Sequence, residues 1–232
     1  MKAAGERIAT LPFLCYNTQF MDTQAQTRAV ASAPSLSKQD INLLPLRKYD
    51  GPVKILSDDG RLRAVMPELL GERVLGFDIE VRPTFKSGDS FPPALVQLAG
   101  ESGVYLAQLK KIGDLGLLGA LFADARVIKA GVAIAGDIAK LHEVMPFEPA
   151  GFVELGRMAA KKGIKASGVR TLAANLLGLR ISKGAQCSNW DRNELTPAQI
   201  QYAATDAWVC REIYLFLEQH GHGPDKRAGG KP

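Results

Sequence analysis

Val74-Leu75-Gly76-Phe77-Asp78-Ile79-Glu80 is a short apolar run that predicts a buried β-strand, and the other elements are placed relative to it. Asp78 and Glu80 stand at its end, one residue apart. Because side chains alternate along a strand, both carboxylates project from the same face. Like charges about 4 Å apart repel by roughly 4 kcal/mol at an effective dielectric of about 20, which favours a cation between them. A divalent metal held by oxygen ligands is one explanation, and a strand end with two hydrated acids is the other.

Composition and charge indicate a soluble protein of one domain with appendages. The chain has 232 residues, of which 46% are hydrophobic and 23% charged, enough apolar material for a substantial core. No apolar run in the sequence is long enough to predict a membrane span. The net charge of +5 permits a nucleic-acid partner. The 3 cysteines lack zinc-ligand spacing, so we expect a reducing setting, cytoplasmic or otherwise intracellular.

The sequence divides into three parts. Residues 1–40 are rich in Ala, Thr, Gln and Ser and are expected to form a poorly ordered N-terminal extension. A targeting peptide, or a true start at Met21, are alternatives for this part. Residues 41–220 are expected to form the folded domain, and residues 221–232 a flexible basic tail.

The first half of the domain is predicted to contain strands and one helix. Strands are expected at residues 53–56, 74–80, 94–98 and 104–106. Gly100 and Gly103 mark the turn between the last two strands. A helix capped by Ser57 or Asp58 should run to about Leu70. The last three strands suggest an antiparallel meander.

The second half is predicted to be mainly helical. Leu115, Leu118, Leu121 and Phe122 recur at helical spacing, and a strand returns at residues 127–132. Further helices are expected at residues 134–145, 155–162, 168–178 and 197–219. Strands first, then alternating elements and helices, indicate an α/β fold with a mixed central sheet and helices on both faces.

The last helix has the clearest boundary signals. Thr196 is a good N-cap, Pro197 suits the first helical position, and Gln199 completes a capping box. Gly221 is the predicted terminator. The helix is expected to bury Ile200, Ala203, Ala204, Ala207, Ile213 and Leu217.

Three further polar residues on helices have two explanations each. Tyr202 and Asp206 are four residues apart on the last helix, so they share a face at the edge of its apolar stripe. Asp137 lies in the first turn of the helix after the 127–132 strand. Taken alone, the pair is explained as a structural contact and Asp137 as an acid that offsets the helix dipole. Functional roles are the alternative.

The chain resembles the DEDD superfamily of 3′–5′ exonucleases in three motifs: Asp78-Ile79-Glu80, Gly131 through Asp137 to Leu141, and Tyr202-Ala203-Ala204-Thr205-Asp206-Ala207. The last motif is of the tyrosine type, since the histidine type would have His at position 201, where this chain has Gln. Within that type, the residues before Tyr202 look like the Werner syndrome exonuclease domain, and ribonuclease D is also similar. The residues that carry this likeness are Lys183, Ser188-Asn189-Trp190 and Leu195-Thr196. The Ala94-Leu95-Val96-Gln97-Leu98 strand also fits the family, and the resemblance covers roughly residues 45–218.

The resemblance implies an RNase H-like fold and a metal-dependent 3′–5′ exonuclease that releases nucleoside 5′-monophosphates. Two divalent ions, Mg²⁺ or Mn²⁺, would activate a water and stabilise charge on the entering and leaving oxygens. The family pattern assigns Asp78 to both ions, Glu80 and Asp206 to the first, and Asp137 to the second, largely through water. Tyr202 would orient the attacking water. No organic cofactor is expected.

A stretch of a single charge sign lies between Glu154 and Asp191. Its basic residues are Arg157, Lys161, Lys162, Lys165, Arg170, Arg180 and Lys183, with no acidic residue among them. Such a stretch suits a phosphate backbone, and a solvated helix surface is the alternative. The predicted nucleic-acid-binding residues are Lys161, Lys162, Lys165, Arg170, Lys183 and Asn189.

We therefore predict an exonuclease that acts on a single-stranded or recessed 3′ end of nucleic acid. DNA is favoured over RNA because the segment around Asn189 and Trp190 resembles the Werner type. A ribonuclease D-like enzyme that trims RNA is the nearest alternative. A catalytically silent binding module is another, although binding alone has no use for four converging acids. A structural protein without a nucleotide ligand would leave the acids and the basic stretch unexplained.

Overall fold

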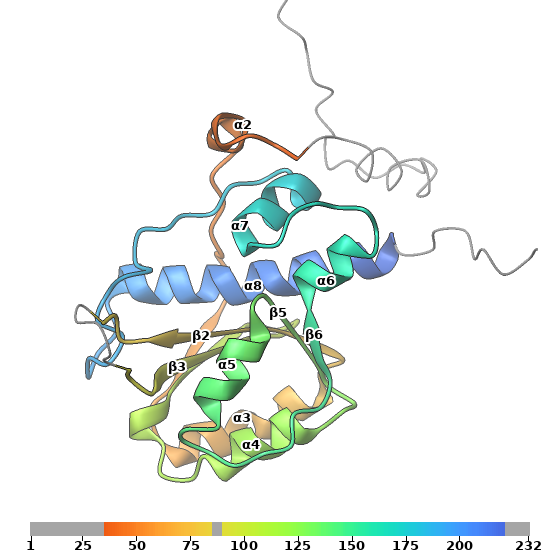
Figure 1. Ribbon diagram of the computed structural model, residues 1–232. Helices are drawn as coiled ribbons and strands as arrows, with labels where there is room; N and C mark the ends of the chain where they lie inside the picture. The colour runs from red at the N-terminus through yellow and green to blue at the C-terminus, as the bar shows by residue number, and fades with distance from the viewer. Residues whose placement is uncertain (1–34, 85–89, 221–232) are drawn as a thin grey trace, which may run out of the picture.

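The computed structural model describes residues 35–84 and 90–220, and within them the protein forms a six-stranded mixed sheet with helices on both faces (Figure 1). The strands are β1 Val53–Leu56, β2 Val74–Val81, β3 Pro93–Ala99, β4 Val104–Gln108, β5 Ile128–Gly131 and β6 Phe152–Glu154. Across the sheet their order is β1-β4-β3-β2-β5-β6. The predicted α/β fold with a mixed, doubly covered sheet is confirmed.

β2, β3 and β4 form the predicted antiparallel meander. Its second turn is closed by a backbone hydrogen bond of 2.9 Å from the Gly100 amide to the Gly103 carbonyl. The other pairs are parallel: β1 with β4, β5 with β2, and β6 with β5. The carboxyl ends of β2, β5 and β6 therefore point to the same edge of the sheet.

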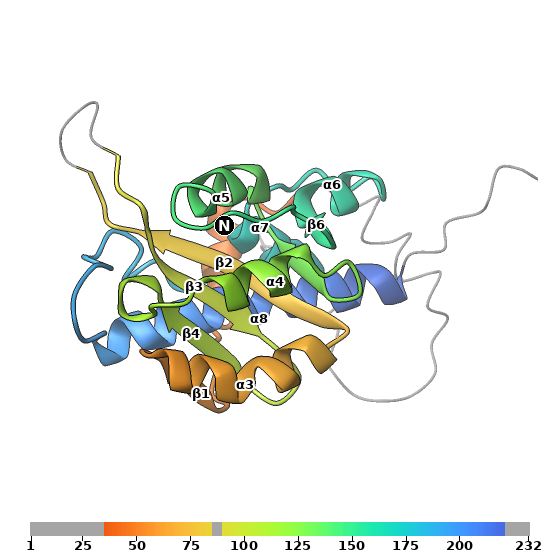
Figure 2. The same cartoon turned by 90° about the horizontal axis from the view of Figure 1, so that it is seen from below.

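One face of the sheet is covered by α3 (Asp59–Gly71), α4 (Gly116–Ala123) and α5 (Ile134–Leu141). Figure 2 shows α3 and α4 lying across the strands from this side. The predicted start of α3 is confirmed, since the Asp58 side chain accepts a hydrogen bond of 2.8 Å from the Arg61 amide.

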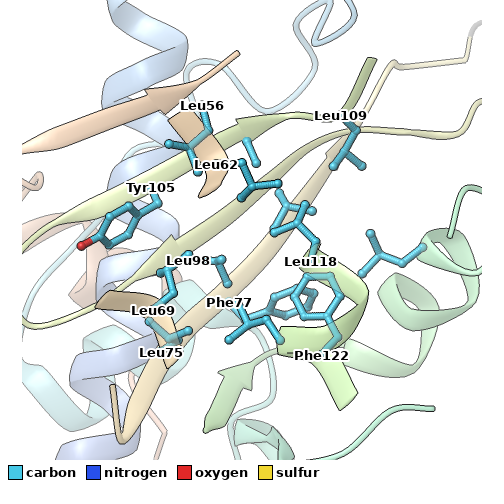
Figure 3. Packing of buried hydrophobic residues seen from close by; sticks show 14 of the residues in the cluster. Leu56, Leu62, Leu69, Leu75, Phe77, Leu98, Tyr105, Leu109, Leu118 and Phe122 are labelled. Atoms are coloured by element: carbon cyan, nitrogen blue, oxygen red, sulfur yellow. The ribbon is translucent and has the colours of Figure 1, made fainter. Parts of the chain in front are cut away.

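The core on this face is apolar and contains aromatic rings that meet edge to face. Phe77 of β2 lies 5.8 Å from Phe122 and 5.3 Å from Phe152, measured between ring centroids, and both pairs are T-shaped. Leucines of α3 and the strands surround Phe77 and Phe122 in Figure 3. Because alternate residues of β2 face this core, the intervening ones face the opposite helical layer.

That opposite layer is α8 (Pro197–Gln219), whose start is the predicted one. The Thr196 hydroxyl accepts a hydrogen bond from the Gln199 amide, and the Gln199 side chain accepts one from the Thr196 amide. Pro197 occupies the first helical position. The predicted capping box is therefore confirmed.

α8 is covered in turn by α6 (Leu155–Ala160), α7 (Val169–Leu172) and the π-helical segment η2 (Ala173–Leu177). Its alanines 203, 204 and 207 pack against the strands, whereas Val209 and Ile213 join the cluster that holds α6 and α7. All the predicted stripe residues are buried except Ile200, which is partly buried. Because other elements cover α8 on more than one face, its buried apolar residues are not confined to the single predicted stripe.

Two helix predictions were wrong in part. α5 ends at Leu141 instead of residue 145, because the Leu141 carbonyl accepts hydrogen bonds from the amides of Val144 and Met145 in a tight turn before Pro146. The helix predicted at 168–178 is divided into α7 and η2, and it ends at Gly178 with φ of 64°. The sequence also gave no sign of β6, which is too short for a periodic pattern.

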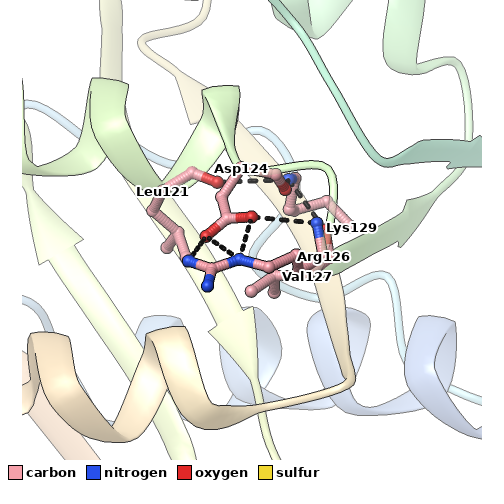
Figure 4. Close-up of polar contacts among 5 residues, drawn as sticks. All are labelled: Leu121, Asp124, Arg126, Val127 and Lys129. Atoms are coloured by element: carbon pink, nitrogen blue, oxygen red, sulfur yellow. Dashed lines mark hydrogen bonds and ion pairs between the residues drawn. The ribbon is translucent and has the colours of Figure 1, made fainter.

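The connection from α4 to β5 is fixed by a buried lysine (Figure 4). The Lys129 ammonium donates to the carbonyls of Leu121, Asp124 and Val127 at 3.1, 2.8 and 2.8 Å. Burial lowers the pKa of Lys129 to about 8. The Arg126 guanidinium pairs with the Asp124 carboxylate at 2.6 Å on the surface side. These contacts hold the start of β5, the strand that leads to Asp137.

Two short elements complete the described chain, α2 (Lys38–Leu43) and η1 (Leu109–Lys111). The predicted boundary at residue 41 falls inside α2, so the division into extension and domain stays a prediction. Most of the extension, with Met21, and the tail, with Gly221, lie outside the described residues. None of the helices found in 35–84 and 90–220 combines the length and apolar character needed to cross a bilayer.

Candidate active site

Three carboxylates meet between β2 and α8. Asp78 and Glu80 project from β2 toward α8, and Asp206 projects from α8 toward them. One carboxylate oxygen from each lies within 4.8 Å of the other two. Glu80 and Asp206 are 9% and 4% exposed, so the group is largely withdrawn from solvent. The structure thus brings together three of the four predicted acids.

A glycine in β2 allows α8 to come this close. Gly76 faces α8 two residues before Asp78, and a Cβ there would overlap the Ala207 carbonyl oxygen and lie 2.7 Å from the Arg211 amide nitrogen. The small side chains of Ala203 and Ala207 line the same interface. The helix backbone therefore lies directly on the strand, and Asp206, the residue before Ala207, comes within reach of Asp78.

Asp137 lies in the first turn of α5, which follows β5 through an unusual residue. Ala133 has φ of 60° and ψ of 28°, in the left-handed region that non-glycine residues seldom adopt. The amide of Ile134 next to it donates a hydrogen bond of 3.0 Å to the Glu154 carboxylate. Asp137 is near enough for its charge to raise the pKa of Asp78, but it is not in the three-carboxylate group.

The pKa values of the acids rise because they are buried together. Burial raises the pKa of Glu80 to about 10, and repulsion from Asp78 and Asp206 adds to this. Burial, then repulsion from Asp206 and Asp137, raises the pKa of Asp78 well above its ordinary value. Burial and the Glu154 charge raise the pKa of Asp137 to about 7. Positive charge beside these carboxylates would therefore favour their ionised forms.

Asp206 has two neighbours that partly offset its burial. Burial raises its pKa to about 7, while hydrogen bonding from Tyr202 and the positive charge of Arg170 act in the opposite direction. Arg170 is also tied to the protein backbone, since its Nε donates to the Ile181 carbonyl at 3.2 Å. The Arg170 charge therefore acts on the acid site itself, which the sequence did not indicate.

Tyr202 lies one helical turn before Asp206 and is partly buried. Burial, and then the Asp206 charge, raises the pKa of its hydroxyl, so the hydroxyl keeps its proton at neutral pH. Its ring packs against Trp190 with 5.9 Å between centroids. Trp190 is buried and donates from Nε1 to the Gln186 carbonyl at 3.3 Å. The Tyr202 ring thus packs against an aromatic side chain that is itself held in place by burial and a hydrogen bond.

The loop that carries Trp190 is attached to the start of α8 by Gln199. The amide nitrogen of this buried side chain donates to the Ser188 hydroxyl and to the Asn189 carbonyl, both at 3.0 Å. The same side chain forms the capping box with Thr196. One glutamine therefore fixes both the helix start and the loop behind Tyr202.

The predicted nucleic-acid-binding residues differ in their surroundings. Lys161, Lys165 and Lys183 are exposed, whereas Lys162 is partly buried and its pKa is lowered by that burial. Asn189 is exposed, but its side-chain oxygen accepts a hydrogen bond of 3.1 Å from the Asp191 amide. That oxygen stabilises a local turn, a contact not foreseen from the sequence.

Sequence reasoning also missed two polar residues beside the acids. Glu154 ends β6 and connects α5 to α6 through hydrogen bonds to the amides of Ile134 and Gly156. Gln97 lies in β3 directly opposite Asp78. A single polar residue within the apolar run of β3 was the available signal for Gln97. Glu154 had none, because β6 itself was not foreseen.

The donor atoms fit a hard divalent cation. All come from carboxylates, which suit Mg²⁺ or Mn²⁺ better than softer metals that favour His and Cys. A bound cation would also remove the repulsion that raises the pKa values of these acids. The observed group is therefore suited to divalent metal chemistry.

Comparisons with known proteins agree with this chemistry. A family described as 3'-5' exonuclease matches residues 53–221. The bifunctional 3'-5' exonuclease/ATP-dependent helicase WRN of Mus musculus is 30% identical over 220 residues, which cover 88% of this chain and 15% of that protein. Ribonuclease D of Haemophilus influenzae is 31% identical over 126 residues, which cover 54% of this chain and 32% of the enzyme. The chain thus spans a small part of both relatives.

A solved structure supports the fold. The crystal structure of the Aedes aegypti Nibbler EXO domain superposes with a TM-score of 0.68, and the match covers 75% of this chain and 92% of that one. The two sequences are 21% identical, so this likeness concerns the fold. The predicted RNase H-like architecture is confirmed.

Proposed function

Because the chain belongs to the 3′–5′ exonuclease family of the DEDD type, we propose that it shortens DNA from the 3′ end by a two-metal mechanism. Membership makes it a divalent-metal-dependent hydrolase of phosphodiester bonds in nucleic acid. The proposal adds the number of cations, the residues that hold them, the polynucleotide and the products, which are nucleoside 5′-monophosphates.

One observation carries the proposal: Asp78, Glu80 and Asp206 converge within 4.8 Å from two elements far apart in the sequence. Asp78 would offer oxygens to both cations, and Glu80 and Asp206 would complete the first site. Asp137 would hold the second cation largely through water, in keeping with its position outside the group of three. Bound cations would activate the attacking water and stabilise charge on the entering and leaving oxygens.

The remaining roles belong to uncharged and basic side chains. The Tyr202 hydroxyl, which keeps its proton, would orient the attacking water while Trp190 holds the ring in place. Arg170 would add positive charge next to Asp206 and the substrate phosphate. Exposed Lys161, Lys165 and Lys183, with Lys162 and Asn189, would bind the rest of the strand.

DNA is the proposed substrate because the segment around Asn189 and Trp190 resembles the Werner type. A second candidate is RNA, since ribonuclease D is among the relatives. We also propose that residues 41–220 are the exonuclease domain, with an extension at 1–40 and a tail at 221–232.

Matched DNA and RNA oligomers of one sequence, labelled at the 5′ end, test the choice of substrate. Each is digested with a free and with a recessed 3′ end, in Mg²⁺ and in Mn²⁺, and kcat/KM is compared. We expect higher values on DNA, and no digestion of either by Asp206→Asn. A preference for RNA would replace DNA with the ribonuclease D-like alternative. Tight binding without digestion of either would indicate a silent binding module.

A further inference from the structure

A buried glutamine beside the acids lacks the hydrogen bonds that its amide requires. Gln97 in the middle of β3 is 0% exposed, and neither Oε1 nor Nε2 has a hydrogen-bond partner. In the register of the sheet it stands opposite Asp78, so both side chains face α8. All the other residues of β3 are apolar.

An unpaired amide in this position lowers the stability of the fold. A buried polar group without a partner costs about 1–3 kcal/mol, whereas an apolar side chain of the same shape costs nothing of the kind. The other side chain with such an orphaned atom in the described chain is Tyr105, on the opposite face of β4. Gln97 differs from Tyr105 in that it faces the carboxylates. A carboxylate that accepts a hydrogen bond from its amide would explain why a glutamine is buried at this position.

Glu80 is the carboxylate that the amide can serve. Glu80 pairs with Leu95, which places it diagonally across the two strands from Gln97, within reach of a long side chain. The nearby Gln97 side chain also lowers the pKa of Glu80, against the stronger effect of burial. A hydrogen bond from the Gln97 amide to the Glu80 carboxylate would pair both side chains.

We propose that Gln97 is a positioning residue, whose Nε2 donates to the ionised Glu80 carboxylate and turns its other oxygen toward Asp78 and Asp206. The inference rests on the proposed cation site. A ligand held by a second hydrogen bond keeps one rotamer, so less freedom is lost when the cation binds. Gln97 itself contacts neither substrate nor cation.

The Gln97→Met variant separates this role from a purely structural one, because methionine keeps the shape and removes both amide atoms. If the amide were only an orphaned core group, the variant would bind Mn²⁺ as the wild type does. A positioning role predicts that Mn²⁺ affinity falls on the order of ten-fold to a hundred-fold. The melting temperature in chelator should stay unchanged or rise, since an unpaired buried amide is lost.

The full chain is titrated with Mn²⁺, and binding is monitored by calorimetry and by the electron paramagnetic resonance signal of free Mn²⁺. Gln108→Met is the matched control, because Gln108 is also buried in the sheet but donates to the carbonyls of Arg192 and Asn193. Its Mn²⁺ affinity should equal that of the wild type. A fall as large as that of Gln97→Met would overturn the inference.

A double-mutant cycle with Glu80→Gln tests the route of the effect. Once Glu80 has lost its charge, Gln97→Met should weaken Mn²⁺ binding little further. Fully additive losses, or undiminished affinity in Gln97→Met, would overturn the role of Gln97 and leave the proposed function standing. A wild-type chain that binds no Mn²⁺ would overturn both.

Discussion

At the scale of single residues, Tyr202 and Asp206 show how one helix face combines a hydroxyl with a carboxylate. The two lie one turn apart on α8, and hydrogen bonding from Tyr202 counteracts the rise in the pKa of Asp206. Trp190 supports the tyrosine ring from behind. Replacing each residue with its closest isostere therefore tests separately the two proposed roles, positioning of water by Tyr202 and binding of a cation by Asp206.

Asp206→Asn should lower kcat by orders of magnitude and weaken Mn²⁺ binding, because it removes a charge from the proposed cation site. Tyr202→Phe should give a smaller but clear loss in kcat with nearly unchanged Mn²⁺ affinity, since the hydroxyl is not a proposed ligand. Both variants should melt cooperatively and still bind single-stranded nucleic acid. If Tyr202→Phe keeps full turnover and Asp206→Asn only unfolds the protein, the pair is structural.

The pKa values of the acids predict how metal and pH act together on stability. Asp137 and Asp206 have pKa values of about 7, and Glu80 of about 10, all above those of an unfolded chain. The folded chain without metal therefore holds protons that the unfolded chain releases. The contribution of these three acids to stability is therefore greatest at acid pH, where they are protonated in both states, and it is lost as the pH rises through about 7 toward 10.

A cation favours the ionised carboxylates, so Mn²⁺ should raise the melting temperature more at about pH 8 than at about pH 5.5. The measurement is thermal unfolding in EDTA and in Mn²⁺ at both pH values. Asp206→Asn serves as the control and should show a smaller Mn²⁺ effect. An Mn²⁺ effect that is equal at the two pH values, or larger in acid, would contradict this coupling.

At the scale of elements, the contact of α8 with β2 decides whether Asp206 reaches the two acids of the strand. Gly76 leaves room for the helix backbone, and a Cβ there would overlap Ala207. The start of α8 is fixed separately, by the capping box of Thr196 and Gln199. Gly76 therefore determines how closely α8 approaches β2. The capping box determines where α8 begins, and so where Asp206 lies along it.

Gly76→Ala should push α8 away from β2, lower the free energy of unfolding by about 1–3 kcal/mol and weaken Mn²⁺ binding. Gly71→Ala is the control, since a Cβ at the end of α3 meets no atom within 4 Å. Urea unfolding and Mn²⁺ titration of both variants give the comparison. Equal behaviour of the two alanine variants would show that the close packing at Gly76 has no bearing on the site.

How far the sequence predicted these elements depends on how local their causes are. The capping box of α8 and the alternation along β2 act within a few residues, so both were predicted from the pattern. β6 and the early end of α5 depend on the neighbouring strand β5 and on a tight turn, which leave little periodic signal. The position of Arg170 beside Asp206 arises only when α7 packs over α8.

The candidate site divides in the same way. The acids and Tyr202 were predicted from their resemblance to family motifs, and the structure brings Asp78, Glu80 and Asp206 together. Gln97 lies in the 94–98 strand, which resembles the family but was assigned no role, and Glu154 belongs to no family motif. Their positions follow from strand pairing, which the sequence did not predict at the level of individual pairs.

At the scale of the whole molecule, α6, α7 and the following loop form a layer over α8 that carries the basic stretch. Lys161 and Lys165 of this layer are exposed, and Lys162 is partly buried. Figure 1 shows α7 on the side of α8 away from the sheet, whereas α6 overlaps α8 in that view. A strand that enters the site from this side would meet positive charge along its backbone.

Replacing Lys161, Lys162 and Lys165 together by Gln should weaken substrate binding and reduce its salt dependence. The slope of log K against log salt should fall by about 0.7 for each lost single-strand phosphate contact. kcat at saturating substrate should change little, because such contacts bind ground and transition states alike. An unchanged slope would show that these lysines form only a solvated surface.

Digestion of a 5′-labelled oligomer by the full chain, with and without chelator, tests most directly whether these acids form a metal-dependent exonuclease site. EDTA should abolish digestion, Mg²⁺ or Mn²⁺ should restore it, and the products should form a ladder that shortens from the 3′ end. Asp206→Asn should give no ladder under any of these conditions. Full activity in EDTA, or internal cuts in a circular substrate, would contradict a two-metal 3′–5′ exonuclease at these acids.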